Sequence, residues 1–237
     1  MSEVREVLGA ARQAGLDVVA ITDHNTLVNA IAAQAIAHEY GVTVVIGEEI
    51  STRQGHLLGL FLKNRVSPGS PLAETIGAVH AQGGIAIVAH PYDPVSFGVL
   101  NPWRGSMSEE DLLRLGFDAI ETFNACLPTR RPNERAVELA GRTTAAIVAG
   151  SDAHSAATVG LATTLFTGRS AEDLRQSILL RQTTARGQRW PLRLYVDLFG
   201  KRELRYAGVA ASYALALCGA AAMAAALAVR SGIVRAL

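Results

Sequence analysis

VVAITDHN, residues 18–25, decides the fold class because it is a run of small and β-branched apolar residues that stops at an acid and a histidine. Runs of this composition are typical of strands buried on both faces, as in parallel sheets. A strand that ends at Asp23 and His24 would deliver both side chains to the carboxyl edge of its sheet. In β/α barrels, that edge carries the residues that perform the chemistry.

Four further apolar runs repeat this pattern, and most of them follow a segment with helical spacing. The runs cover residues 43–46, 84–88, 118–120 and 145–148. Each is followed by polar residues of ligand type, namely Gly47-Glu48-Glu49, Ala89-His90-Pro91, Glu121-Thr122-Phe123-Asn124 and Gly150-Ser151-Asp152-Ala153-His154. This alternation predicts β-α repeats built around a parallel sheet.

The segments between these runs predict helices and one long loop. Helices are predicted over residues 3–13, 27–39, 72–82, 109–115, 133–140 and 171–179. Gly15, Gly41 and Gly83 stand where helix C-caps are expected. The segment 91–110 is rich in Pro, Gly and Ser, lacks periodicity and is longer than most connections, so it predicts a rim loop near the site.

Composition restricts the class of protein. A length of 237 residues suits one sizeable domain. With 22 Lys and Arg against 21 Asp and Glu, bulk charge does not suit binding of a polyanion, so any phosphate recognition must be local. Cys126 and Cys218 form no paired motif, which favours a reducing compartment over a disulfide framework or a thiolate zinc site. The N-terminal stretch has no central apolar block, so it is not a secretory signal.

Histidines and acids at the strand ends predict a metal site. Of the six histidines, His24, His56, His90 and His154 follow or lie within apolar runs. One such histidine alone is more often a hydrogen-bonded structural residue than a ligand, but the joint pattern favours ligands. Asp152 and His154 are two residues apart, so in an extended segment their side chains point the same way.

The donor types indicate which metals would bind. Imidazole nitrogens and carboxylate oxygens without thiolates suit zinc, manganese or iron(II). Neighbouring metals would need a bridging carboxylate, for which Glu49 or Asp152 could serve. For Asp23 two readings stand side by side: a carboxylate that orients a ligand or takes part in proton transfer, or a helix N-cap.

The motifs and their order along the chain resemble those of the PHP family, which are metallohydrolases named after polymerase and histidinol phosphatase domains. The resemblance covers roughly the first 190 residues and is carried by Thr-Asp-His at 22–24, Gly-Glu-Glu-Ile-Ser-Thr at 47–52, Gly-His-Leu-Leu-Gly at 55–59, Ala-His-Pro at 89–91, Ile-Glu-Thr-Phe-Asn at 120–124 and Gly-Ser-Asp-Ala-His-Ser at 150–155. It implies a distorted seven-stranded β/α barrel that hydrolyses phosphoesters with two or three divalent metal ions. Carried over by position, the metal ligands would be His24, Glu49, His56, His90, Asp152 and His154.

The last two motifs are similar to those of phosphatases and exonucleases that act on nucleotides or short oligonucleotides. The expected substrate is therefore a phosphorylated small molecule or a short nucleic acid, with Asn124 as a candidate substrate-binding residue. A hydrolase of a non-phosphate bond stays open as an alternative, because the ligands do not specify the bond.

One departure from the family is large. Members begin with a strand that ends in a His-x-His pair, and this chain has no such pair. We therefore expect the first barrel strand and two ligands to be missing, with an unpaired strand edge and an incomplete metal site. Glu49, His56 and His90 could still hold one metal. Two hypotheses account for this: a start upstream of Met1, or a truncated relative that acts as a non-catalytic binding or structural module.

Phosphate binding needs a cation besides the metals. Arg130 and Arg131 follow the fifth ligand-bearing run, where a rim loop could present a guanidinium fork to a phosphate. The alternative is two solvated loop arginines.

The C-terminal segment is a candidate membrane anchor. Residues 206–229 are 24 residues without a charge, long enough for a helix to span a bilayer. Half are alanine, which inserts more weakly than leucine, so a helix packed on the barrel or on a second subunit is the alternative. The basic linker 191–205 would place the domain of residues 1–190 in the cytoplasm, anchored to the inner face of the membrane. The oligomeric state is not predicted.

Overall fold

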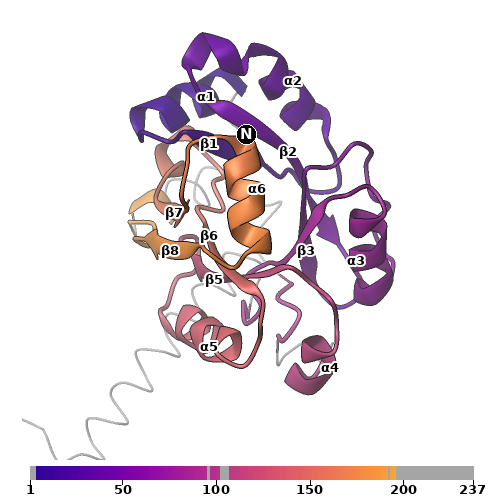
Figure 1. The fold of residues 1–237 in the computed structure, drawn as a ribbon. Coiled ribbons are helices and arrows are strands. Elements are labelled where there is room, and N and C mark those ends of the chain that lie inside the picture. Colours follow the sequence, from indigo (N-terminus) through magenta and orange to yellow (C-terminus); the bar gives the residue numbers. More distant parts are fainter. Residues whose placement is uncertain (1–3, 95–96, 102–106, 192, 196–237) are drawn as a thin grey trace, which may run out of the picture.

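A computed structural model of the chain describes residues 4–94, 97–101, 107–191 and 193–195. It is a mixed α/β fold whose main sheet curls into a half barrel (Figure 1). The six strands of this sheet lie in chain order. They are β1 (Val18–Ile21), β2 (Thr43–Ser51), β3 (His56–Leu60), β4 (Ile85–Val88), β5 (Ala119–Asn124) and β6 (Ala146–Gly150).

The two ends of the sheet differ. β1 pairs only with β2 among the described residues, so the expected unpaired strand edge is confirmed there. At the other end, β7 (Ala162–Leu165) and β8 (Thr184–Gly187) form a two-stranded antiparallel sheet that contacts β6. This second sheet was not predicted from the sequence.

Strand direction is mixed. β1 and β2, β4 and β5, and β5 and β6 pair in parallel, whereas β3 is antiparallel to both β2 and β4. The prediction of a parallel sheet is therefore wrong at β3. The turn at residues 52–55 is too short for the crossover that a parallel neighbour needs, so the chain reverses as a hairpin. The Thr52 hydroxyl closes this turn by donating to the Gly55 carbonyl at 2.6 Å.

All six predicted helices are present, with ends shifted by a few residues at most. They are α1 (Val4–Gln13), α2 (Val28–Ile36), α3 (Leu72–His80), α4 (Glu109–Leu113), α5 (Arg131–Ala140) and α6 (Ala171–Leu179). Short 3₁₀ helices follow at η1 (Ala37–Tyr40), directly after α2, and at η2 (Ala156–Thr158). Gly41, predicted as a C-cap, ends η1 in the left-handed conformation at φ 64°.

Helices α1 to α5 cover the outer face of the half barrel. Leu8 and Ala11 of α1 and Ala33 of α2 pack against Val44 of β2 in one cluster. In a larger cluster, side chains from α3, α4 and α5 pack against outward-facing strand residues, including Ile50, Leu57, Val88 and Ile120. The outer layer therefore contains most of the apolar core.

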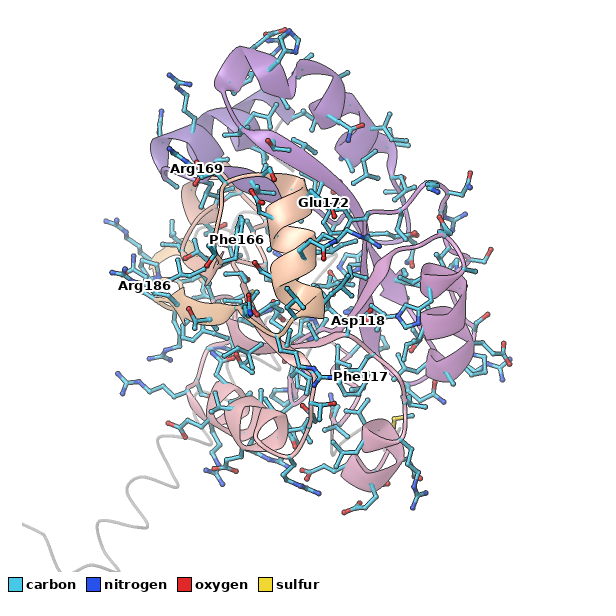
Figure 2. All side chains as sticks on the ribbon, in the orientation of Figure 1. Phe117, Asp118, Phe166, Arg169, Glu172 and Arg186 are labelled. Atoms are coloured by element: carbon cyan, nitrogen blue, oxygen red, sulfur yellow. The ribbon has the colours of Figure 1, made fainter. Side chains whose placement is uncertain are left out.

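Helix α6 packs against the concave face, and its residues Leu174 and Ile178 contact inward-facing strand residues, namely Val45, Leu60, Ile85, Ile87, Ala119, Ala146 and Val148. Phe166, which precedes α6, packs on the same cluster (Figure 2). Arg169 lies with Nη2 2.8 Å from Oδ1 of Asp17 and so links the α6 region to the segment before β1. Apolar side chains thereby fill the half of the concave face that lies toward the amino ends of the parallel strands.

Strand alternation explains what fills the other half. Side chains of a strand alternate between faces, so Glu49 shares the concave face with Val45, and Glu121 shares it with Ala119. The concave face is thus apolar toward the amino ends of the parallel strands and polar toward their carboxyl ends. That polar end is the candidate site.

The predicted linker and apolar helix mostly lie outside the described residues, including all of 206–229. In the part of the chain that the structure describes, no helix combines the length and apolarity needed to cross a membrane.

Candidate metal centre

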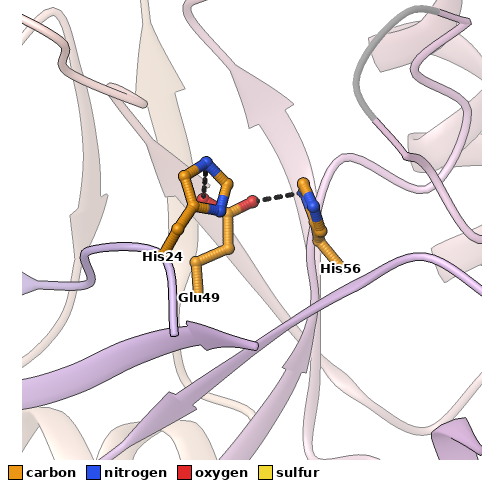
Figure 3. A group of neighbouring side chains, drawn as sticks. All are labelled: His24, Glu49 and His56. Atoms are coloured by element: carbon orange, nitrogen blue, oxygen red, sulfur yellow. Dashed lines mark ion pairs between the residues drawn. The ribbon is translucent and has the colours of Figure 1, made fainter. Parts of the chain in front are cut away.

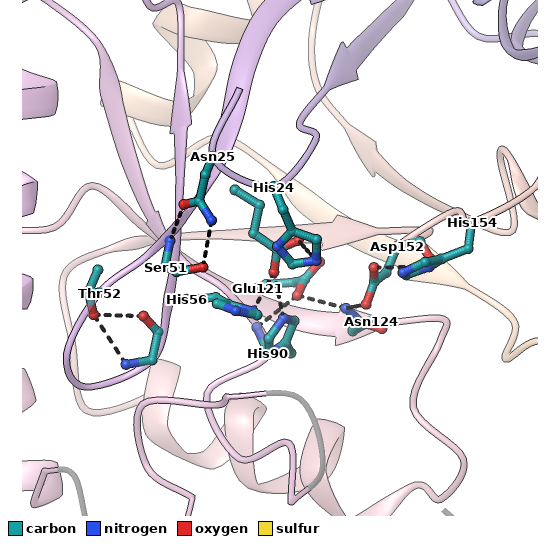
Figure 4. A network of polar contacts seen from close by, with 12 residues as sticks. His24, Asn25, Ser51, Thr52, His56, His90, Glu121, Asn124, Asp152 and His154 are labelled. Carbon is teal, nitrogen blue, oxygen red and sulfur yellow. Dashed lines mark hydrogen bonds and ion pairs between the residues drawn. The ribbon is translucent and has the colours of Figure 1, made fainter. Parts of the chain in front are cut away.

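Every sequence-predicted metal ligand lies at the polar end of the half barrel (Figure 4; Glu49 is labelled in Figure 3). His24 follows β1, Glu49 lies in β2, His90 follows β4, and Asp152 and His154 follow β6. His56 is the first residue of β3. Because β3 is antiparallel, its first residue lies opposite Ser51 near the end of β2, so it reaches the same rim.

Glu49 is the centre of the first group. Its Oε1 lies 2.7 Å from Nδ1 of His56 and 3.1 Å from Nε2 of His90, and its Oε2 lies 3.6 Å from Nε2 of His24 (Figure 3). The rings of His24 and His56 have their centroids 5.0 Å apart, and those of His56 and His90 5.5 Å apart. Three imidazoles therefore surround one carboxylate.

The group is largely withdrawn from water. Glu49, His56 and His90 are buried, whereas the His24 side chain is 52% exposed and forms the open side. Burial alone would raise the pKa of Glu49, but contacts with His56 and His90 hold it well below its usual range. Burial likewise opposes protonation of His90, yet the Glu49 carboxylate raises its pKa to about 10. Glu49 is thus held ionised, the form that binds metals, whereas His90 would have to give up its proton to bind one.

The hydrogen bonding of the buried ring nitrogens indicates whether these residues fit a metal ion. Nδ1 of His56 and Nδ1 of His90 make no hydrogen bond within the described chain. The approach of His56 to Glu49 is short, but it lacks hydrogen-bond geometry. Buried polar atoms normally have partners. One donor atom each from His24, Glu49 and His56 lies within 4.8 Å of the others, and this nitrogen and oxygen set fits a divalent cation.

Asp152 and His154 form a second group beyond His90. His154 donates from Nδ1 to the Asp152 carbonyl at 2.9 Å, and the same nitrogen lies 3.7 Å from Oδ1 of Asp152. Asp152 has φ 46°, so the segment is not extended as predicted. A turn, rather than strand alternation, brings the two side chains together. The His154 ring meets the ring of Trp190 edge-on at 5.8 Å.

Asn124 and Glu121 connect the two groups. Asn124 donates from Nδ2 to Oε2 of Glu121 and to Oδ2 of Asp152, both at 3.1 Å. The same Glu121 oxygen accepts from the His90 backbone at 2.8 Å. Asn124 therefore lies inside the network, and its amide is already engaged with two carboxylates.

Glu121 was missed by the sequence analysis as a site residue. It is 3% exposed, and burial raises its pKa to about 7. Gly150 makes room for it, since a Cβ there would lie 2.1 Å from Oε1 of Glu121. The available signal was an acid directly after the apolar run 118–120, in the motif Ile-Glu-Thr-Phe-Asn.

Asn25 is a second missed residue, and all four of its polar groups are hydrogen-bonded. Its backbone N–H donates to the Glu49 carbonyl at 3.0 Å, and its carbonyl accepts from Nε of Arg65 at 2.6 Å. Its Oδ1 accepts from the Ser51 backbone at 2.9 Å, while Nδ2 donates to Oγ of Ser51 at 3.0 Å. Asn25 thus attaches the loop that carries His24 to β2.

Asp23 adjoins the first group through its backbone, where its carbonyl accepts from the Glu49 N–H at 3.2 Å. Leu27 is the N-cap residue of α2, so the reading of Asp23 as a helix N-cap is wrong.

Arg130 and Arg131, the predicted phosphate-binding residues, have different surroundings. Arg131 begins α5, is 70% exposed, and has Nη1 3.9 Å from both Glu134 and Glu138. Arg130 lines a cleft of about 830 Å³ together with Arg189, Trp190 and Tyr195. Because Trp190 also contacts His154, this cleft adjoins the second group.

The predicted rim loop does reach the site. The Phe97 carbonyl accepts from the His56 N–H at 2.9 Å, and the Phe97 ring lies 5.3 Å from the His56 ring. Residues 95–96 and 102–106 of this loop are outside the described ranges.

Comparison with known proteins shows which family the chain resembles. The family model described as "PHP domain" matches residues 1–150, and the model "PHP-associated" matches residues 130–183. An uncharacterized protein of Methanocaldococcus jannaschii, MJ1587, is 38% identical over 125 residues, which cover 53% of this chain and 68% of that protein.

Two solved structures show a similar fold. A two-domain protein from Bacteroides vulgatus, containing a predicted PHP-like metal-dependent phosphoesterase, matches with a TM-score of 0.61 at 15% identity over 79% of this chain and 61% of that chain. The lesion-specific endonuclease PfuEndoQ from Pyrococcus furiosus matches with a TM-score of 0.52 at 13% identity over 73% of this chain and 50% of that chain. This chain thus spans less than two thirds of either protein.

Proposed function

The chain belongs to the PHP family, and we propose that it is a divalent-metal-dependent phosphoesterase that acts on a nucleotide or a short oligonucleotide. The observation that carries this proposal is the cluster of three histidines around the buried, ionised Glu49. A carboxylate in such surroundings would cost free energy unless it had a cationic partner. Without a metal this partner is protonated His90; a divalent ion would replace that proton and bind the carboxylate together with neutral imidazoles.

The residues divide into two sets of metal ligands. His24, Glu49, His56 and His90 would form the first set, and Asp152 and His154 the second. When bound, divalent ions act as Lewis acids on a phosphoryl group and make water a better nucleophile. In the hydrolysis, a water oxygen bonds to phosphorus, the ester P–O bond breaks, and the proton goes to the departing alcohol. Asp23 is proposed to orient His24 or to move that proton.

Two features support a nucleotide-like substrate. Arg130 and Arg189 line the cleft beside His154, where guanidinium groups could bind phosphates of a substrate longer than one phosphoryl group. The cleft also contains the partly buried ring of Tyr195, and aromatic rings are the kind of surface on which bases stack. A lesion-specific endonuclease has a similar fold.

Metal content and hydrolysis, measured together, test the proposal. The full chain is expressed with added Mn²⁺ or Zn²⁺, and its bound ions are counted by elemental analysis. Release of phosphate from nucleoside monophosphates and release of nucleotides from short oligonucleotides are then followed. We expect metal-dependent hydrolysis that Glu49→Gln abolishes. The matched control is Glu138→Gln, since this carboxylate is 68% exposed. Bound metal without hydrolysis of any phosphate ester would instead support a non-catalytic module.

The arginines provide a sharper prediction within this function. Arg130→Ala should raise KM for an oligonucleotide by about tenfold to a hundredfold, the loss expected for a hydrogen bond to a charged group. Arg131→Ala should change KM little, because this side chain points to Glu134 and Glu138. Steady-state kinetics on both variants decide the matter. Equal KM values for wild type and Arg130→Ala would remove Arg130 from the binding site.

A further inference from the structure

Glu48 is a carboxylate on the outer face of β2. Neighbouring residues of a strand point to opposite faces, so Glu49 faces the metal centre while Glu48 faces the apolar outer layer, on the same side as Ile46 and Ile50. Glu48 is 0% exposed, and its Oε1 has no hydrogen-bond partner among the residues that the structure describes. An apolar residue would fill such a place at a smaller cost in free energy. The stability of the outer layer therefore does not explain this carboxylate.

Glu48 contacts the connection between β3 and α3 through both of its oxygens. Its Oε2 accepts a hydrogen bond from the Val66 N–H at 2.9 Å, and its Oε1 lies 3.8 Å from Nε of Arg65. Burial raises the pKa of Glu48, whereas these two contacts lower it. The Arg65 side chain is 52% exposed, so it joins this buried carboxylate to the surface of the molecule.

Arg65 also contacts the loop that carries His24. Its Nε donates to the Asn25 carbonyl at 2.6 Å, and Asn25 directly follows His24 in the chain. The Asn25 side chain is hydrogen-bonded to Ser51 at the end of β2 (Figure 4). The loop is therefore held from two directions, by β2 and by the connection after β3. Such support matters most for His24, because it is half exposed while the other members of the first ligand set are buried.

We propose that Glu48 and Arg65 are positioning residues for the metal ligand His24. Glu48 holds the Arg65 guanidinium in place, and Arg65 fixes the Asn25 carbonyl and with it the loop that presents His24. This inference rests on the proposed function, because it needs a metal ion bound by the first ligand set. Strand β2 then contributes a ligand from one face, through Glu49, and support for another ligand from its opposite face.

Zinc affinity of the full chain, measured by calorimetry, gives the first test. Arg65→Met keeps the apolar stem of an exposed side chain and removes the guanidinium. It should weaken Zn²⁺ binding by about tenfold, the lower end of the range for residues that orient a ligand. Arg65→Lys keeps a cationic donor and should recover part of this loss. The matched control is Arg12→Met, since the exposed Arg12 also donates to a backbone carbonyl, that of Tyr40 at 2.7 Å, far from the ligands. It should bind zinc as the wild type does.

Glu48 is tested by a variant that keeps its shape. Glu48→Gln can still accept from the Val66 N–H, but it loses the charge that attracts Arg65. It should weaken Zn²⁺ binding by about threefold, as expected for a partly exposed ion pair. Because Glu48 acts through Arg65, the double variant Glu48→Gln, Arg65→Met should bind zinc as Arg65→Met alone does. Effects that add would show that Glu48 does not act through Arg65.

The identity of the displaced ligand needs a spectroscopic measurement. Binding of zinc shifts the ¹⁵N signal of the imidazole nitrogen that holds it, and single histidine variants assign these signals. In the wild type we expect zinc-shifted signals from His24, His56 and His90. In Arg65→Met at saturating Zn²⁺, only the His24 signal should lose its shift or broaden. A merely structural role of Arg65 would disturb all of these signals equally or none of them.

The remaining outcomes separate this inference from the proposed function. Unchanged zinc affinity in Arg65→Met overturns the inference, and so does an equal disturbance of the histidine signals. Complete loss of zinc binding in Arg65→Met also overturns it, since His24 is one ligand among several. A wild type whose His24 lacks a zinc-shifted signal, although His56 and His90 have one, removes the inference and leaves the phosphoesterase standing on the other ligands. A wild type that binds no zinc and no other divalent ion removes the proposed function, and the inference with it.

Discussion

Four residues of the candidate site hold a backbone conformation that side chains rarely adopt. Asn25, His90, Phe97 and Asp152 have positive φ, and only Phe61 and Arg181 share this among the other described non-glycine residues. Asn and Asp tolerate the left-handed region, whereas His and Phe do so less readily. Such strain costs about 1–3 kcal/mol per residue and persists where the surroundings enforce it. The site is thus held by its loops as well as by its strands.

Asn25 gives a prediction about this loop geometry. Asn25→Ala should weaken metal binding by about tenfold to a hundredfold, as is typical when a residue that orients a ligand is lost. The physical reason is that both side-chain hydrogen bonds to Ser51 vanish and the loop that carries His24 is released from β2. Isothermal titration with Mn²⁺ or Zn²⁺ measures the effect.

Three comparison variants separate the causes. Asn25→Gly keeps the positive φ without strain, and should still weaken binding because the hydrogen bonds are lost. Asn25→Asp keeps the Oδ1 acceptor and should fall between Asn25→Gly and the wild type. Asn64→Ala removes an exposed amide and should bind as the wild type does. Wild-type affinity in Asn25→Gly would show that only the backbone conformation matters.

At the scale of elements, α6 shows what local sequence can and cannot specify. Its predicted bounds, residues 171–179, agree with the structure. The reason is local, since Ser170 and Asp173 form a capping box that starts the helix. Its place on the concave face depends on contacts with strands far away in the chain, so helical periodicity did not predict it. Strand β3 differs, because its direction follows from the short turn at residues 52–55, which is a local feature.

Helix α6 also provides a matched pair for a stability prediction. Ile178 is 1% exposed within the concave cluster, whereas the next residue, Leu179, is 46% exposed. Ile178→Ala should lower the free energy of unfolding by about 2–5 kcal/mol, the range for large core residues. Leu179→Ala should cost about 0.5 kcal/mol or less. Urea denaturation of both variants measures the difference, and equal losses would mean that α6 does not pack as described.

At the scale of the whole molecule, the order of motifs along the chain was enough to place the site. Strand ends converge because of the sheet, so His24, Glu49, His56 and His90 meet as expected. The sequence did not predict the contacts that join the two groups of proposed ligands. That link runs through Glu121 and Asn124, and it depends on the space at Gly150 and on the turn at Asp152. Such contacts arise only once all strands are assembled.

Because the proposed metal ligands are spread from residue 24 to residue 154, over five strands of the main sheet, metal binding should stabilise the entire fold. A ligand that binds only the folded state at about 100 times its Kd adds about 2.7 kcal/mol. In a domain of this size, that corresponds to a rise in Tm of about 5–10 °C. We expect a chelator to lower Tm by this amount and added Mn²⁺ or Zn²⁺ to restore it, as followed by circular dichroism.

The decisive comparison is the metal-dependent rise in Tm, not Tm itself, because removing a buried side chain also destabilises the metal-free protein. His56→Ala should abolish the rise, since it deletes a buried ligand beside Glu49. His38→Ala removes an exposed histidine of η1 and should keep the full rise. If the rise in His56→Ala equalled that of the wild type, the ions would bind elsewhere on the chain, and the cluster around Glu49 would be a hydrogen-bonded network instead of a metal centre.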